Sequence, residues 1–260
     1  MTFRTLIRRS LRFHWRSHLG VVLGAAIGSA ALIGALVVGD SVKGSLRDSA
    51  LARLGTVDVA LDAKDRFFRG ELASELGPGF VPVLRVSGTV SKRDASARAN
   101  QVQVLGINSQ FARLGVGAAT ESRLAMPHGA EVELNTALAS HLRVAVGDTI
   151  LLRVGKPTAL SGDAAISPKN NSSVVLRLPV ARIASDHEML AQFNLQPGQS
   201  AYNIFVPLDY LQSALGQPGR ANFLLAASQS ADEGNSRLEK AWQLADTETS
   251  LTNDAATKTL

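Results

Sequence analysis

The strongest constraint on this chain is a run of twenty uncharged, mostly apolar residues from Leu19 to Val38, LGVVLGAAIGSAALIGALVV. A helix of that length spans about 30 Å, the thickness of a bilayer hydrocarbon core. Arginines precede the run and Asp40 follows it, so the positive-inside rule places residues 1–18 in the cytoplasm and the chain after Asp40 outside. A cleavable signal peptide is the alternative, but its apolar core is normally only about 7–15 residues long. The run therefore predicts an uncleaved transmembrane helix over residues 19–38.

The first eighteen residues form a basic leader without acidic side chains. Apolar residues recur at spacings of three or four, which indicates an amphipathic helix along the inner membrane surface. A merely solvated leader is the alternative. The residues predicted to set the topology and to contact lipid headgroups are Arg4, Arg8, Arg9, Arg12, Trp15 and Arg16.

The leader also explains the basic character of the chain, whose net charge is +5. Five of the 27 Lys and Arg residues precede the apolar run, which leaves 22 against 22 Asp and Glu. Because the remainder is neutral overall, we expect no nucleic-acid partner. The chain has no cysteine, so its outside domain must be stabilised by its core alone.

Small residues form two rows inside the apolar run. Such rows let a second helix approach closely, although glycine and alanine are also generally common in membrane helices. The predicted helix-packing residues are Gly20, Gly24 and Gly28 in one row and Ala26, Ala30 and Gly34 in the other.

The chain after the apolar run mixes helical and strand patterns. We predict a stalk helix over 39–55, an outside domain over 56–250 and a polar tail over 251–260. Period-two alternation predicts strands, which include a hairpin over 80–108 and a strand over 173–185 whose Pro179 favours a sheet edge or a bulge. Helices are predicted within 64–76, after the N-cap Asn135, after Pro207, and over 236–246. These patterns indicate an α+β domain, with two lobes joined near 155–173 or 108–130.

Residue patterns for catalysis are missing from the sequence. It contains no GxxxxGK[ST] phosphate loop, no GxSxG nucleophile elbow and no cysteine nucleophile. His14 and His18 are one helical turn apart, but they lie in the basic leader, where packing at the headgroups is the simpler interpretation. We therefore assign no catalytic, cofactor-binding or metal-binding residue and expect that the chain is not an enzyme.

Three segments together resemble the MacB-like periplasmic core domain of FtsX-type ABC transporter permeases. They are the leader and apolar run with VVGDSVKGSLRD, the segment LNTALASHLRVAVGDTILLRV over 134–154, and YNIFVPLDYLQSALGQPGRANFLLA over 202–226. Arg143 is a departure, because the family more often has glycine there, so the turn is expected to differ. The motif residues, to which we assign structural roles, are Gly39, Asp40, Leu138, Ala139, Leu142, Gly147, Asp148 and Pro207.

The resemblance implies a permease subunit in a bacterial inner membrane with its main domain in the periplasm. In that family, a partner ATPase binds ATP, and its motion is relayed through long helices to periplasmic domains that handle lipoproteins, peptides or small molecules. The implied partners are a cognate ATPase subunit, a second permease copy, and a periplasmic or outer-membrane component. This chain would be the N-terminal part of a longer permease, or the gene product would be truncated. The alternatives are a signal-anchored periplasmic binding or scaffold domain that works without an ATPase, and, third, an envelope hydrolase.

Overall fold

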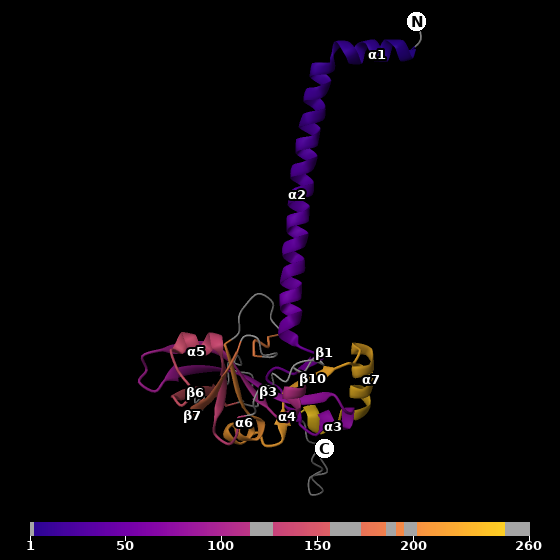
Figure 1. Cartoon of the computed structure of the whole chain (residues 1–260). Coiled ribbons are helices and arrows are strands. Elements are labelled where there is room, and N and C mark those ends of the chain that lie inside the picture. The colour runs from indigo at the N-terminus through magenta and orange to yellow at the C-terminus, as the bar shows by residue number, and fades with distance from the viewer. Residues whose placement is uncertain (1–2, 115–126, 157–172, 186–190, 195–201, 248–260) are drawn as a thin grey trace, which may run out of the picture. The chain divides into compact units, whose positions relative to one another are not determined.

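The computed structural model describes residues 3–114, 127–156, 173–185, 191–194 and 202–247. The chain divides into two compact units, Met1–Ala50 and Leu51–Leu260, and Figure 1 shows the elements of both. The predicted tail over 251–260 lies outside the described residues.

The first unit is helical. Helix α1 runs from Phe3 to Phe13, the backbone bends at His14, and helix α2 begins at Trp15 and ends at Leu54. No proline interrupts these 40 residues, so α2 includes both the apolar run and the predicted stalk. Gly55 follows with a φ of 61°, a left-handed conformation in which glycine commonly ends a helix.

The second unit contains short helices around a large sheet. Its strands are β1 (Val57–Asp62), β2 (Phe68–Arg69), β3 (Phe80–Lys92), β4 (Arg98–Ile107), β5 (Val132–Asn135), β6 (Thr149–Gly155), β7 (Ser173–Ala184), β8 (Asn203–Pro207), β9 (Arg220–Ala221) and β10 (Phe223–Ala227). Its helices are α3 (Leu72–Leu76), α4 (Ser109–Arg113), α5 (Thr136–Leu142), α6 (Leu208–Leu215), α7 (Ala231–Ala241) and a 3-10 turn over Leu244–Thr247. The α+β class that the sequence predicted is confirmed.

The main sheet closes on itself. Its strand order is β1-β10-β3-β4-β8-β5-β7-β6, and β6 also pairs with β3, so the strands from β3 to β6 form a barrel. The pairs β4–β8 and β5–β7 are parallel, and the other pairs are antiparallel. Strand β3 changes partner along one edge: residues 80–83 pair with β10, and residues 88–92 pair with β6. Because β3 belongs to both parts of the sheet, it joins the barrel to the β1–β10 extension.

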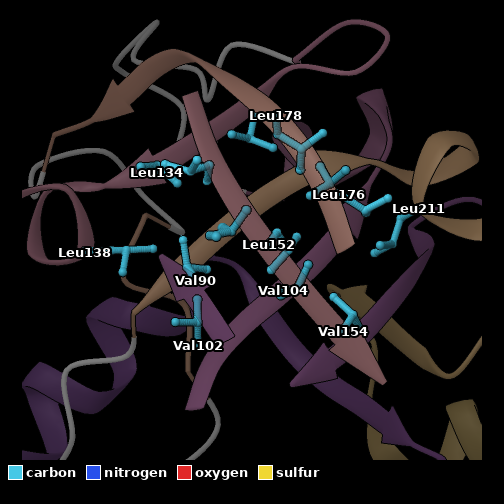
Figure 2. Close-up of a cluster of buried hydrophobic side chains, with 14 of the residues drawn as sticks. Val90, Val102, Val104, Leu134, Leu138, Leu152, Val154, Leu176, Leu178 and Leu211 are labelled. Atoms are coloured by element: carbon cyan, nitrogen blue, oxygen red, sulfur yellow. The ribbon is translucent and has the colours of Figure 1, made fainter. Parts of the chain in front are cut away.

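The barrel interior is filled by aliphatic side chains. Along β6, Ile150, Leu152 and Val154 are buried and alternate with residues that are more exposed, as expected for a strand with one face in a core. Figure 2 shows Leu152 and Val154 in one cluster with side chains from neighbouring strands and helices. Its labelled members are Val90, Val102, Val104, Leu134, Leu138, Leu152, Val154, Leu176, Leu178 and Leu211.

A second face of the unit is built by α3 and α7 against the β1–β10 extension. Leu72 and Leu76 of α3 are buried, and they belong to a cluster with Leu224 and Ala226 of β10. Leu238 of α7 packs against this cluster. The unit therefore has apolar cores both inside the barrel and beneath α3 and α7.

The short helix predicted within 64–76 is confirmed as the five-residue α3, and Phe68–Arg69 before it pair with β9. Other predicted elements need correction. The last helix begins earlier than predicted, at Ala231, because the side chain of Ser230 accepts a hydrogen bond from Glu233 N and caps it. The segments proposed to join two lobes, 155–173 and 108–130, lie largely outside the described residues.

The proline in β7 does not mark a sheet edge, because β7 lies between β5 and β6. Pro179 pairs with Thr149 of β6, and pairing with β5 begins one residue later, at Val180. A register shift follows between Val132 and Glu133. The alternative of a bulge is therefore the one that the structure supports, and the missing N–H of Pro179 falls where β5 does not pair.

Candidate functional site

The apolar run of α2 presents its side chains outward. The segment Trp15–Leu51 is long and apolar enough to cross a membrane, and none of its apolar window is buried within the chain. Large side chains such as Val21, Ile27 and Leu32 are between 67 % and 72 % exposed. Exposed apolar surface on this scale is stable in hydrocarbon and unfavourable in water. Among the described residues, this is the single helix that meets the requirements for a membrane span.

The two small-residue rows lie on this helix and are open. A Cβ atom placed on Gly20, Gly24, Gly28 or Gly34 would meet no atom within 4 Å, so the described part of the chain packs nothing against these positions. Ala26 and Ala30 are likewise exposed. The geometry permits close approach of another helix along either row, and the packing role of these residues stays a prediction.

The leader forms α1 as an amphipathic helix. Its large apolar side chains are exposed, from Ile7 at 44 % to Phe13 at 82 %. At the junction with α2, the Arg16 guanidinium carbon lies 5.8 Å from the centre of the Trp15 ring, a cation–π contact. Contact of the leader arginines with lipid headgroups stays a prediction.

The motif residues around 134–154 have structural roles in the barrel. Asn135 accepts a hydrogen bond from Leu138 N and caps α5, which buries Leu138, Ala139 and Leu142. The turn that follows depends on Asp148, whose Oδ2 accepts a hydrogen bond from Ala145 N at 2.9 Å. Gly147, in the same segment, has a φ of 93°. The remaining motif residues come from the other two segments: Pro207 is the N-cap of α6, and Gly39 and Asp40 lie inside α2.

Arg143 takes the conformation that a glycine would take. It is the C-cap of α5, with a φ of 53° and a ψ of 50°, in the left-handed region. Its N–H still bonds to the carbonyl oxygens of Ala139 and Ser140, so the αL cap forms without glycine. The expectation that this turn differs from the family's stays a prediction. What the structure shows is a left-handed cap that carries a side chain, which costs more for arginine than for glycine.

A buried ion pair escaped the sequence reasoning. Asp246 has a fully buried side chain, and its carboxylate accepts hydrogen bonds from Arg69 Nε at 3.0 Å and from Gln243 N at 3.0 Å. Glu75 binds the same guanidinium at 2.8 Å. Burial raises the pKa of Asp246, but the hydrogen bonds from Arg69 and Gln243 outweigh burial and hold that pKa below its usual range. The pair fixes the 3-10 turn to β2, across 177 residues of sequence that carry no local signal of it.

Buried amide side chains hold the short segment 191–194 against the barrel. Asn203 donates from Nδ2 to the carbonyl oxygens of Ala191 and Phe193, both at 3.0 Å. Gln103 donates to the same Phe193 oxygen at 2.9 Å and to Asn203 Oδ1 at 3.2 Å. These amides satisfy backbone acceptors inside the fold, which is a structural role.

The structure offers no candidate for catalysis in the described ranges. No group of three or more His, Cys, Asp or Glu side chains is placed there to hold a metal ion. His14 lies at the bend between α1 and α2, and His18 lies on α2. The fold and the exposed apolar surface of α2 together define a class of protein: an α+β domain attached to an apolar helix that can span a membrane.

Comparison with known families identifies this class. The family described as MacB-like periplasmic core domain matches residues 19–241, so the chain belongs to that family, which ABC transporter permeases carry. The family is a transporter component rather than an enzyme class. The family match includes both the apolar helix and the barrel.

Solved structures with a similar fold were also found. One is the extracellular domain of the noncanonic ABC-type transporter YknZ from Gram-positive bacteria, at 13 % identity, a TM-score of 0.42, and coverage of 70 % of this chain and 90 % of that one. Another is the periplasmic region of MacB from Actinobacillus actinomycetemcomitans, at 13 % identity, a TM-score of 0.41, and coverage of 72 % and 84 %. A third is a domain of a putative permease protein from Porphyromonas gingivalis, at 10 % identity, a TM-score of 0.39, and coverage of 72 % and 88 %. No curated protein matched the chain.

Proposed function

We propose that this chain is the N-terminal part of an ABC transporter permease and relays motion from a partner ATPase to its periplasmic domain. The observation that carries the proposal is the length of α2. A helix of 40 residues is about 60 Å long, roughly twice the hydrocarbon thickness. The apolar half fits the membrane, and the half from Gly39 to Leu54 continues as helix beyond it.

Membership of the permease family supports a partner that hydrolyses ATP, because the chain itself has no phosphate loop. ATP is therefore expected on the partner and no cofactor on this chain. The open small-residue rows support further helices packed beside α2, contributed by a continuation of the permease, by the partner, or by a second copy.

The proposed location is the inner membrane, with the N-terminus in the cytoplasm and the barrel in the periplasm. Support comes from the leader, whose five arginines precede the apolar helix while no acid occurs among the first 39 residues. Cargo released outside the inner membrane, such as lipoproteins or peptides, would then be handled by the periplasmic domain. A periplasmic or outer-membrane component that contacts this domain is part of the same proposal.

The competing proposal is a signal-anchored periplasmic binding or scaffold domain that works without an ATPase. The small-residue rows favour the permease, because a helix that faces only lipid does not need them. The two proposals differ in one measurable property, which is dependence on a nucleotide.

The test is co-purification from membranes of the full-length gene product with its neighbouring ATPase. We expect a complex whose ATP hydrolysis is faster than that of the ATPase alone. Replacement of Gly24 by Leu on one small row should reduce that complex, and Ala25→Leu should not, because at about 100° per residue Ala25 lies outside both rows. Recovery of the intact membrane protein without any ATPase, under conditions that preserve other transporter complexes, would favour the anchored binding domain.

A further inference from the structure

The apolar side of α1 is too large to remain in water. Five large side chains lie on it, namely Phe3, Leu6, Ile7, Leu11 and Phe13, and their exposure ranges from 44 % to 82 %. At about 100° per residue they fall within an arc of about 160°, which Ser10 shares. A contiguous apolar face of this kind indicates a surface that binds a membrane or another protein.

The opposite side of α1 is basic. Arg4, Arg8 and Arg12 follow one another at a spacing of four, so they lie on one row along successive turns. Arg9 lies on the far flank of the same polar arc. No carboxylate occurs in residues 1–39, so nothing in this segment neutralises the row. A guanidinium matches phosphate oxygens in shape and charge.

The position of α1 in the chain indicates what its surface binds. The backbone bends at His14, and Trp15 begins the helix that can span a membrane, so a single residue separates α1 from that helix. In Figure 1, α1 lies crosswise to the start of α2. A bilayer surface offers acyl chains to the apolar arc and phosphates to the arginine row at the same depth. A protein partner would need a groove that is apolar on one wall and acidic on the other.

We propose that α1 is an in-plane anchor that binds anionic phospholipid. The apolar arc enters the acyl boundary, and Arg4, Arg8 and Arg12 bind lipid phosphates. Depth of insertion therefore depends on anionic lipid and falls at high salt, because each arginine contributes through charge. This property holds whether or not the chain works with an ATPase.

The absence of cysteine in the chain allows a direct test with single spin labels. The full chain is reconstituted in phosphatidylcholine vesicles with or without phosphatidylglycerol. Ser10→Cys places a label on the apolar arc, Thr5→Cys places one on the arginine side, and Ile33→Cys reports that α2 has inserted. Accessibility to oxygen against a water-soluble nickel chelate measures the depth of each label.

With phosphatidylglycerol, we expect the label at position 10 to be several-fold more accessible to oxygen than to the chelate, and the label at position 5 to show the reverse. In vesicles without phosphatidylglycerol, or when Arg4, Arg8 and Arg12 are all replaced by Gln, the label at position 10 should move toward water. The label at position 33 should stay in lipid. Equal depth at positions 5 and 10, no dependence on phosphatidylglycerol, or protection of position 10 only when an ATPase is bound would each overturn the proposal.

Discussion

Gly88 lies at the point where the barrel closes, which makes it the sharpest test of the fold. It pairs with Val102 of β4 on one edge of β3 and with Val154 of β6 on the other. A Cβ atom there would lie 3.0 Å from the carbonyl oxygen of Arg153 and 3.1 Å from Leu152 Cδ1. The first of these is backbone of the closing strand, which cannot rotate away.

Gly88→Ala should therefore destabilise the second unit. Overpacking a well-packed core costs about 1–3 kcal/mol, and the reduced entropy of the unfolded chain returns about 0.4–1 kcal/mol. We expect a net loss of about 1–2 kcal/mol in the free energy of unfolding. Gly155→Ala is the matched control on β6, because a Cβ there meets nothing within 4 Å, and its effect should stay within about 0.5 kcal/mol of zero.

The assay is urea unfolding of the full chain in detergent, followed by the fluorescence of Trp242. That ring lies 6.3 Å from the ring of Phe68, so its emission reports on packing. A Trp15→Phe background removes the other tryptophan. If Gly88→Ala and Gly155→Ala shift the unfolding midpoint equally, the β3–β6 pairing is wrong and the barrel is not closed.

Three further predictions follow from single positions. Arg143→Gly should stabilise the second unit by about 0.5–1 kcal/mol, because glycine avoids the strain of a left-handed φ. Thermal unfolding should then show a higher midpoint. A lower midpoint would mean that the arginine side chain stabilises the fold by more than the backbone strain costs. Asp246→Asn should cost about 1–2 kcal/mol at pH 7, since it leaves the Arg69 guanidinium with only Glu75. Because the pKa of Asp246 is lowered in the folded state, the stabilisation by its carboxylate is complete above about pH 4 and is lost as pH falls through the lowered pKa. The difference in the free energy of unfolding between wild type and Asp246→Asn, measured by urea unfolding, should therefore become smaller in acid. A difference that does not change with pH would contradict the stabilising role of the ionised carboxylate. Gly24→Leu should weaken association of labelled chains in vesicles by about tenfold, while Ala25→Leu, outside both rows, should not. Equal effects would show that the glycine row is not a packing surface.

Local patterns in the sequence were enough to predict many of the elements. The strand–helix–turn–strand segment over 131–154 could be predicted because its signals are adjacent: Asn135 caps the helix, Gly147 makes the turn, and alternation marks the following strand. The apolar run could be predicted for the same reason, since twenty uncharged residues need no tertiary context to indicate a membrane span.

Features that depend on distant pairing could not be predicted. Closure of the barrel joins residues 88–92 to 150–154, and alternation in either strand is the same whichever strand lies beside it. The pairing of Phe68 with Ala221 could not be predicted either, because nothing near Phe68 in the sequence marks its partner. The Arg69–Asp246 ion pair could not be predicted for the same reason, because single charged residues are common and the sequence does not mark their partners.

For the candidate site, the sequence predicts how the residues are arranged along the helices, and their functional roles stay predictions. The arginine row and the small-residue rows follow from helical spacing alone. Their proposed partners are lipid, other membrane helices or an ATPase. The described part of the chain packs no such partner against the glycine positions, so neither sequence nor fold specifies the partner. Arg143 lies in the left-handed C-cap of α5, which its residue type does not indicate, because arginine seldom takes that conformation.

The most direct measurement of the central claim is the distance between two stalks during the ATPase cycle. A spin label on Ser45→Cys, which is exposed on α2 beyond the apolar run, reports that distance between two copies assembled with their ATPase. Labels at Ser41→Cys and Ser49→Cys within one copy, diluted with unlabelled chain, control for melting of the helix, since eight helical residues span about 12 Å. The account predicts that the distance between copies changes with ATP and returns after hydrolysis while the spacing within one copy is constant. A distance between copies that is the same with and without ATP would contradict it.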